Sequence, residues 1–261
     1  MELSSQIKNL LESDRYTTDS IGKSESRVLL FEDKVLKIQT YNSEVQNELD
    51  AMRWLEGRLS VPQLIHHECV DGKSYLLMTR LPGQMACSEH YMRTPERLVT
   101  LLVNALQSLW RVDISACPLG PSLDMKLRKA RHNVERGLVD LADTQPETFG
   151  PGGFESPAAL LTWLEEHRPV EEPVLSHGDF CLPNILIQDD GSLSFIDLGQ
   201  AGISDKWQDI ALCYRSLLNN YSGKYGGKRY PAFDPDMLFE KFDLEPDEDK
   251  LRYYLLLDEL L

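Results

Sequence analysis

The hydrophobic pattern of this chain changes its period near residue 81, and this change constrains the fold most. Before it, residues 27–38 read RVLLFEDKVLKI, two β-rich runs that predict a hairpin, and residues 74–81 predict another strand. Between them, apolar residues at helical spacing predict a helix over residues 43–59. From about residue 95 the apolar positions recur mainly at helical spacing. Strands and one helix are therefore expected first, and helices afterwards.

The second part of the chain is expected to be mainly helical, with one short β ribbon at 185–197. Helices are predicted over residues 95–112, 123–142, 157–167, 205–219, 235–243 and 247–260. We therefore predict an α+β chain of two lobes. Residues 1–81 would hold a small antiparallel sheet and one helix, and residues 82–261 the larger helical lobe. A cleft between such lobes is where a ligand is expected.

Charge and composition narrow the range of partners. The chain has 42 acidic and 27 basic residues and a net charge of −15, which argues against nucleic acid and anionic membranes and favours a cationic ligand. Solubility alone explains the acidity equally well. No apolar run is long enough to span a membrane, and the five cysteines show no C-x-x-C spacing. We expect a cytoplasmic protein with reduced thiols, as a monomer or weak dimer.

Residues 184–197, NILIQDDGSLSFID, predict a β ribbon with a metal site at its open end. Asp190-Gly191 favours a two-residue type I′ turn, and that turn would place Asn184 directly opposite Asp197. Directly paired side chains have Cβ atoms about 4.5–5.5 Å apart. An amide oxygen and a carboxylate at this spacing can share one Mg²⁺ ion, which prefers oxygen ligands.

Upstream of this ribbon, the stretch LSHGDFCLPNILI places Asp179 in a loop with Gly178 and Pro183. A carboxylate near bound Mg²⁺ can orient a substrate hydroxyl or accept its proton. His177 is interpreted as a scaffold for the loop backbone rather than as a catalyst. The simpler interpretation of the whole stretch is a hairpin with polar caps.

The combination is similar to the arrangement in protein kinases. His-Gly-Asp, an asparagine five residues after the aspartate, and a strand ending in Ile-Asp-Leu-Gly match the kinase catalytic loop and its metal-binding Asp-Phe-Gly, with Leu198 in place of phenylalanine. Lys37, within VLKI, would hold phosphates, and Glu48 on the following helix would position that lysine. Glu44 could play the same part.

Further nucleotide contacts are predicted from two other stretches of the chain. IGKSESRVL contains one glycine, Gly22, so backbone N–H groups and serine hydroxyls would bind the phosphates. Residues 78–81 could present backbone groups to an adenine edge, although core packing explains Met78 equally well. The residues predicted to contact the nucleotide, besides Lys37 and Glu48, are Ser24, Ser26, Met78, Thr79 and Leu81.

The chain after Asp197 passes almost at once into a helix, which Ser204 or Asp205 would cap. Asp209 on that helix is interpreted as a structural carboxylate. No room is left for a long activation loop, so a small-molecule substrate is favoured over a protein.

Three stretches, LSHGDFCLPNILI, FIDLGQAGISDKWQDIALCYRSL and LRYYLLLDELL, resemble the aminoglycoside 3′-phosphotransferases, bacterial resistance enzymes with a protein-kinase-like fold. The similarity extends from about residue 20 to the last residue. It implies transfer of the ATP γ-phosphate to the 3′-hydroxyl of aminoglycosides such as kanamycin or neomycin, with two Mg²⁺ ions. GTP remains an open alternative as the donor.

The resemblance also implies roles for individual residues. Asp179 would be the catalytic aspartate in contact with the substrate, Asn184 and Asp197 the metal ligands, and Lys37 with Glu48 the phosphate-positioning pair. The C-terminal acids that reach into the drug site would be Asp258, Glu259 and the carboxylate of Leu261. Without the resemblance, LLLDELL would be interpreted as an amphipathic last helix.

Three positions depart from the family pattern. Gln200 replaces an arginine, Asn219 an acidic drug-site residue of some relatives, and Val35 an aromatic that stacks on adenine in others. Two other functions stay open: a kinase of choline, homoserine, a macrolide or another small alcohol on the same fold, and a catalytically silent nucleotide-binding protein.

Overall fold

The computed structural model describes residues 3–11, 15–18, 26–120, 123–142, 144–224, 227–230 and 233–261. The chain forms two compact units that do not follow chain order. Residues 1–88 and 182–200 make up the first, here called the sheet unit. Residues 89–181 and 201–261 make up the second, here called the helical unit. The division expected after residue 81 assigned the 185–197 ribbon to the second part, whereas the structure groups it with the first.

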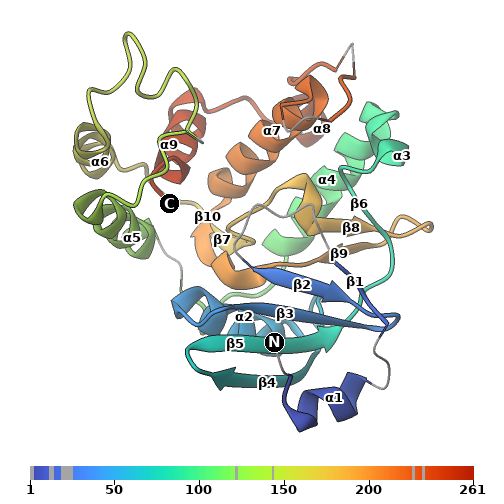
Figure 1. Ribbon diagram of the computed structural model, residues 1–261. Helices are drawn as coiled ribbons and strands as arrows, with labels where there is room; N and C mark the ends of the chain where they lie inside the picture. The colour runs from blue at the N-terminus through green and yellow to red at the C-terminus, as the bar shows by residue number, and fades with distance from the viewer. Residues whose placement is uncertain are drawn as a thin grey trace. The chain divides into compact units, whose positions relative to one another are not determined.

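The sheet unit is built on a five-stranded antiparallel sheet with the order β1-β2-β3-β5-β4 (Figure 1). Its strands are β1 (Thr17–Thr18), β2 (Arg27–Leu30), β3 (Lys34–Thr40), β4 (Leu64–Val70) and β5 (Lys73–Thr79). The predicted β2–β3 hairpin is confirmed, with Leu30 opposite Val35. Strand β4 was not predicted, because HHECV lacks an apolar alternation; its pairing with β5 stabilises it.

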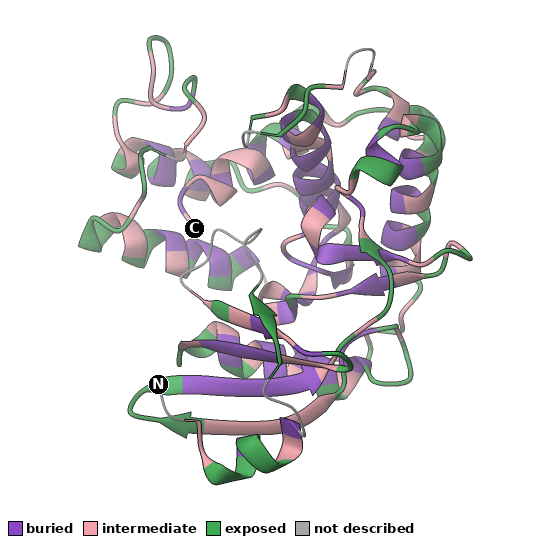
Figure 2. Cartoon of the chain, turned by 45° about the vertical axis from the view of Figure 1, so that its right-hand side comes forward, coloured by how far each residue is buried: buried purple, intermediate pink, exposed green. Residues whose placement is uncertain are grey.

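Two helices belong to this unit: α1 (Ser5–Leu11), which was not predicted, and α2 (Ser43–Leu55), which was. Strand β5 is buried over most of its length, and β3 is buried at its centre, residues 36–38 (Figure 2). Burial of apolar side chains from α1 and the sheet stabilises this unit. The buried cluster consists of Ile7, Leu11, Leu29, Phe31, Leu36, Ile38, Tyr75 and Leu77.

A second, three-stranded sheet explains why residues 182–200 join the sheet unit. It consists of β6 (Gln84–Met85), β8 (Ile185–Ile187) and β9 (Leu193–Phe195), in the order β6-β8-β9. The N–H of Phe195 donates to the carbonyl of Ser60 at 2.9 Å, and the hydroxyls of Ser60 and Ser194 are 2.8 Å apart. The β8–β9 ribbon is therefore bonded to the N-terminal part of the chain.

The register of this ribbon differs from the prediction by one residue. Ile185 pairs with Phe195 and Ile187 with Leu193, and Asn184 lies opposite Ile196 rather than Asp197. The loop has three residues, 189–191, because Asp190 accepts the N–H of Ser192 at 2.8 Å and Gly191 takes a left-handed φ of 83°. This geometry fits a type I turn followed by a left-handed residue. The predicted two-residue turn is wrong.

The helical unit contains each helix predicted after residue 95. Its helices are α3 (Glu89–Met92), α4 (Pro95–Trp110), α5 (Leu123–Arg136), α6 (Pro157–Glu166), α7 (Lys206–Ser222), α8 (Met237–Phe242) and α9 (Glu248–Asp258). Helix α5 ends earlier than predicted, before Gly137, whose φ is 64°. Helix α7 extends further than predicted and ends at Gly223, whose φ of 74° gives a left-handed cap.

The strands β7 (Pro173–Ser176) and β10 (Gly202–Asp205) form a two-stranded antiparallel sheet in the helical unit. Helix α7 packs against α9 and is buried along much of its length (Figures 1 and 2). Its N-cap is Asp205, whose carboxylate accepts the N–H of Trp207 at 3.2 Å. Among the described residues, no helix is long and apolar enough to cross a membrane.

Candidate active site

A cavity of about 330 Å³ lies within the sheet unit, with apolar walls and a polar end. Each described residue that was predicted to bind nucleotide or metal lines it: Ser26, Lys37, Glu48, Met78, Thr79, Leu81, Asn184 and Asp197. Ser24 and Gly22 lie outside the described residues. Its apolar walls include Val28, Leu30, Val35, Met78, Leu186 and Ile196. Such a cavity suits a ligand with one flat apolar part and one charged part.

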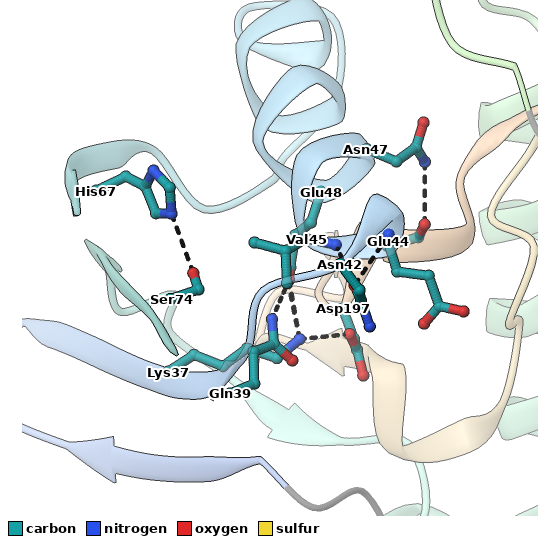
Figure 3. Close-up of polar contacts among 11 residues, drawn as sticks. Lys37, Gln39, Asn42, Glu44, Val45, Asn47, Glu48, His67, Ser74 and Asp197 are labelled. Atoms are coloured by element: carbon teal, nitrogen blue, oxygen red, sulfur yellow. Dashed lines mark hydrogen bonds and ion pairs between the residues drawn. The ribbon is translucent and has the colours of Figure 1, made fainter. Parts of the chain in front are cut away.

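The polar end is organised around Lys37 in the middle of β3 (Figure 3). Its Nζ lies 3.1 and 2.9 Å from the two carboxylate oxygens of Glu48 and 2.7 Å from Oδ1 of Asp197. Burial alone would lower the pKa of Lys37, but the two carboxylates raise it above its ordinary value. Burial raises the pKa of Glu48, against the effect of the Lys37 ammonium. The cavity thus contains a fixed cation at its polar end.

Helix α2 brings Glu48, rather than Glu44, to this lysine. The side chain of Asn42 caps the helix by accepting the N–H groups of Glu44 and Val45, each at 3.0 Å. The side-chain amide of Asn47 donates to the carbonyl of Gly199 at 3.0 Å, which ties the helix to the short helix η2 (Leu198–Gln200) (Figure 3). The alternative partner, Glu44, lies in the first turn of the helix, four residues before Glu48.

Asp197 reaches Lys37 although the ribbon register differs from the prediction. Its backbone has a left-handed φ of 60°, a conformation that non-glycine residues seldom adopt and that often occurs at functional sites. Its side chain is 46% exposed, so a carboxylate oxygen remains accessible at the cavity. Asn184 ends the short helix η1 (Leu182–Asn184) and lines the same cavity. An amide and a carboxylate there fit the oxygen preference of Mg²⁺.

The connector after β5 forms another wall. The N–H of Thr79 donates to the carbonyl of Gln63 at 3.0 Å, and that of Arg80 to Asp33 at 2.9 Å. Gly83, with a φ of 112°, lies against β8: a Cβ at this position would be 2.8 Å from the carbonyl oxygen of Ile187. The connector is therefore fixed on both sides of Leu81.

In the helical unit, the loop after β7 carries Asp179. Hydrogen bonds to Asp209 of α7 hold the start of this loop. The carboxylate of Asp209 accepts the N–H groups of His177 at 2.8 Å and Gly178 at 3.0 Å, and the hydroxyl of Ser176 at 3.0 Å. Burial raises the pKa of Asp209, and His177 with these bonds opposes the shift. His177 is fully buried, and the structure supports its interpretation as a scaffold.

A second cavity, of about 200 Å³, lies within the helical unit at the C-terminus. It brings together Asp258, Glu259 and Leu261, as predicted for a cationic ligand, and also Asn219. However, Asp258 is ion-paired with Arg215 of α7. Glu259 accepts the N–H of Gln145 at 2.9 Å, and burial raises its pKa.

Arg215 was missed by the sequence interpretation. The sequence does contain a signal for it: an arginine within the apolar run ALCYRSLL indicates an ion pair, because a charged residue in an otherwise buried helix needs a partner. Its guanidinium pairs with Asp258 and lies 3.8 Å from Glu259, so one cation is shared by two acids of the cavity. The remaining acids there include Asp140 and the C-terminal carboxylate.

The comparisons with known proteins agree with this geometry. Residues 20–253 match the model of the family described as "Phosphotransferase enzyme family". The chain is 36% identical to the aminoglycoside 3′-phosphotransferase of Enterococcus faecalis, over 100% of this chain and 98% of the relative. It is 35% identical to that of Staphylococcus aureus, with the same coverage.

Solved structures show the same fold. A type VIII aminoglycoside-3′-phosphotransferase superposes with a TM-score of 0.78 at 24% identity, covering 98% of this chain and 97% of that chain. APH(3'')-Id from Streptomyces rimosus, in complex with ADP and streptomycin, superposes with a TM-score of 0.75 at 21% identity, covering 94% and 92%. The predicted α+β, protein-kinase-like fold is confirmed.

Proposed function

We propose that this chain, which belongs to the phosphotransferase enzyme family, transfers the γ-phosphate of ATP to the 3′-hydroxyl of aminoglycoside antibiotics and so confers resistance. The structural observation that carries the proposal is the contact of Lys37 with Glu48 and Asp197 at the polar end of the cavity. The full-length similarity to aminoglycoside 3′-phosphotransferases supports the choice of substrate.

The nucleotide would bind with its base between the apolar walls and its phosphates at Lys37. Val35, Met78 and Leu186 offer an apolar surface for a flat base. The backbone of Thr79 and Leu81 would contact the edge of the base. Ser26 lines the same cavity and would contact the phosphates. Glu48 would hold the Lys37 ammonium toward the phosphate oxygens. GTP also combines a flat base with a triphosphate, so the assay compares ATP and GTP as phosphate donors.

Asn184 and Asp197 would hold Mg²⁺. When bound, this ion neutralises charge on the phosphate oxygens. The chain itself supplies two oxygen donors to the cavity at the open end of the β8–β9 ribbon: Asn184 just before β8 and Asp197 just after β9. The left-handed backbone at Asp197 keeps its carboxylate directed at Lys37 and available to a cation.

Asp179 would act on the acceptor. Its carboxylate would orient the substrate hydroxyl and take up its proton as the phosphate is transferred. Because Asp209 fixes the preceding backbone N–H groups, the loop would hold this carboxylate in one place. His177 and Asp209 would serve as supports and not take part in proton transfer.

The substrate would be recognised through its positive charges. Asp258, Glu259 and the carboxylate of Leu261 share one cavity, in a chain with a net charge of −15. Arg215 would align Asp258 for an incoming amine. The expectations of a monomer or weak dimer and of a cytoplasmic location remain predictions.

The test is an assay of ADP release by the purified protein with Mg²⁺, ATP and one acceptor at a time. Kanamycin is expected to stimulate release, while a 3′-deoxy aminoglycoside is expected to bind without being phosphorylated. Phosphorus-carbon couplings in the NMR spectrum of the product would identify the oxygen that carries the phosphate. Phosphorylation at another hydroxyl would contradict the assignment of the 3′ position.

Other acceptors separate the alternative functions. Release with choline, homoserine or a macrolide, and none with kanamycin, would replace the proposal by another small-alcohol kinase. Nucleotide binding without release for any acceptor would indicate a silent nucleotide-binding protein. Asp179→Asn is expected to lower turnover by about 1,000-fold or more while ATP binding is retained, since only the acceptor step would lose its base.

A further inference from the structure

Lys126 is a buried lysine that the proposed function leaves without a role. It lies on α5 of the helical unit and is 5% exposed. Lysine is almost never buried to this degree unless it is paired. Its ammonium donates a hydrogen bond to the backbone carbonyl of Gly178, with an Nζ···O distance of 3.3 Å. This carbonyl immediately precedes Asp179, which is the proposed catalytic residue.

The peptide group between Gly178 and Asp179 has two donors on its oxygen. Besides Lys126, the side-chain amide of Gln208 donates to the Gly178 carbonyl at 3.2 Å. The N–H of Gly178 donates to Asp209. Gly178 itself has a left-handed φ of 82°, so the chain turns sharply just before Asp179. The orientation of this one peptide plane therefore determines where the Asp179 side chain begins.

A charged donor is not needed to satisfy this carbonyl, because Gln208 already provides a neutral one. Burial of an ammonium carries a cost that a neutral side chain would avoid. Folding alone thus gives little reason for a lysine at this position. A residue that breaks a packing rule next to a functional loop is a candidate for a functional role.

The charges that act on Lys126 lie on α7, on α9, in the Asp179 loop and on α5 itself. Asp209 of α7, Asp258 of α9 and Asp179 of the loop attract its ammonium, while Lys129 on α5 itself repels it. Burial outweighs these attractions and lowers the pKa of Lys126 to about 8. Its charge is therefore lost within a range of pH that is accessible to an activity assay.

We propose that Lys126 is a positioning residue, whose ammonium holds the Gly178–Asp179 peptide so that the Asp179 carboxylate faces the substrate hydroxyl. The inference rests on the proposed function, because it assumes that Asp179 acts on the acceptor. Lys126 does not touch the substrate in this account. It acts through the backbone, and its effect belongs to the transfer step and not to binding.

Lys126→Met tests this with a side chain of similar length and no charge. The kcat is expected to fall by about 100-fold, because the catalytic carboxylate would be misplaced. The KM values for ATP and for the aminoglycoside are expected to stay within about twofold of the wild type. Lys126→Arg, which keeps a charged donor, is expected to recover at least about a tenth of the wild-type kcat. Lys241→Met, at an exposed position of α8, is the matched control and is expected to have no effect.

The pH profile adds a measurement that a purely structural role would not change. The wild-type kcat is expected to decrease above about pH 8 as Lys126 loses its proton. In Lys126→Arg this decrease moves to higher pH, because arginine stays charged. An unchanged kcat in Lys126→Met, or the same alkaline decrease in the wild type and in both Lys126 variants, would overturn the proposal.

Two measurements on the wild type distinguish a failure of the proposed function from a failure of the positioning role: the phosphorylation assay and an NMR titration. A wild type that phosphorylates no alcohol contradicts the proposed function itself. The amide signals of Gly178 and Asp179 test the positioning in either case: they should shift with a midpoint near pH 8 in the wild type. If Lys126→Met does not fold, this wild-type titration and Lys126→Arg decide. Signals that do not move with pH would refute the role of Lys126.

Discussion

Lys37 connects two carboxylates of very different exposure: its Nζ lies 2.9 Å from Oε2 of Glu48, which is 3% exposed, and 2.7 Å from Oδ1 of Asp197, which is half exposed. The same cation therefore satisfies a carboxylate of the core and holds one at the cavity. Loss of the cation would leave the Glu48 charge buried without its main partner, which is more costly than loss of the pair as a whole.

Lys37→Met is expected to lower the free energy of unfolding by about 3–5 kcal/mol, because it leaves one member of a buried ion pair behind. Urea unfolding near neutral pH, monitored by circular dichroism, measures this. The matched control is Lys73→Met at the exposed start of β5, which is expected to change stability by less than about 0.5 kcal/mol. Equal effects of the two substitutions would show that the contact with Glu48 does not stabilise the fold.

Gly83→Ala is expected to distort the connector beside the cavity. The added Cβ would lie 2.8 Å from the carbonyl oxygen of Ile187, in a backbone with a φ of 112°. Gly57→Ala is a sharp control, because its φ of 73° is also left-handed but the added Cβ would meet nothing within 4 Å. The control is expected to cost about 1 kcal/mol for the backbone conformation alone.

The difference between these two alanine variants isolates the effect of the close approach. Gly83→Ala is expected to cost at least about 1 kcal/mol more than Gly57→Ala and to weaken ATP binding, which calorimetry measures directly. Equal stability and unchanged ATP affinity would mean that the connector can move away from β8 without consequence.

The fold could be predicted from hydrophobic periodicity to a large extent. The β2–β3 hairpin, α2 and the helices after residue 95 follow from local spacing alone. Strand β4 could not be predicted this way, because HHECV is stabilised by its pairing with β5. The grouping of residues 182–200 with the sheet unit also depends on long-range hydrogen bonds, such as that from Phe195 to Ser60. Such contacts leave no periodic signal in the sequence.

Asn184 and Asp197 line the same cavity, as predicted, although the turn from which this was predicted is wrong. A two-residue turn was predicted to place Asn184 opposite Asp197, but Asp190 stabilises a longer loop that shifts the register by one residue. The left-handed backbone of Asp197 then directs its carboxylate to Lys37. Lys126 and Arg215 were not predicted, because their importance depends on burial and on partners from other elements.

Asp258→Asn is expected to raise the KM for a cationic aminoglycoside by about tenfold and to leave the KM for ATP unchanged, since one charge at the C-terminal cavity is removed. Steady-state kinetics measures both constants. Asp249→Asn, at the exposed first turn of the same helix α9, is the matched control and is expected to change neither.

Ionic strength separates a direct attraction from a change in structure. The wild-type KM for the aminoglycoside should increase with added salt, and it should increase less in Asp258→Asn, because screening acts on the charge that the substitution removes. An unchanged KM in Asp258→Asn would show that Arg215 fully neutralises this acid and that it does not bind substrate.

Lys126 is expected to make the stability of the folded protein increase at alkaline pH. Its pKa is lowered from 10.5 to about 8 by burial in the folded state. Below pH 8 the ammonium is charged in both the folded and the unfolded protein, and the cost of burying it is fully present. Between about pH 8 and 10.5 the unfolded chain binds more protons, so the free energy of unfolding attributable to this group rises with pH.

The predicted rise is roughly 3 kcal/mol for the difference between the two pKa values. Urea unfolding at a series of pH values measures it as the difference between the wild type and Lys126→Met, which lacks the titrating group. Lys241→Met should retain the wild-type rise, and parallel curves for all three proteins would contradict the burial of a charged Lys126. Because kcat is expected to decrease over the same pH range in which stability increases, the lysine would be kept for positioning Asp179 at a cost to the fold.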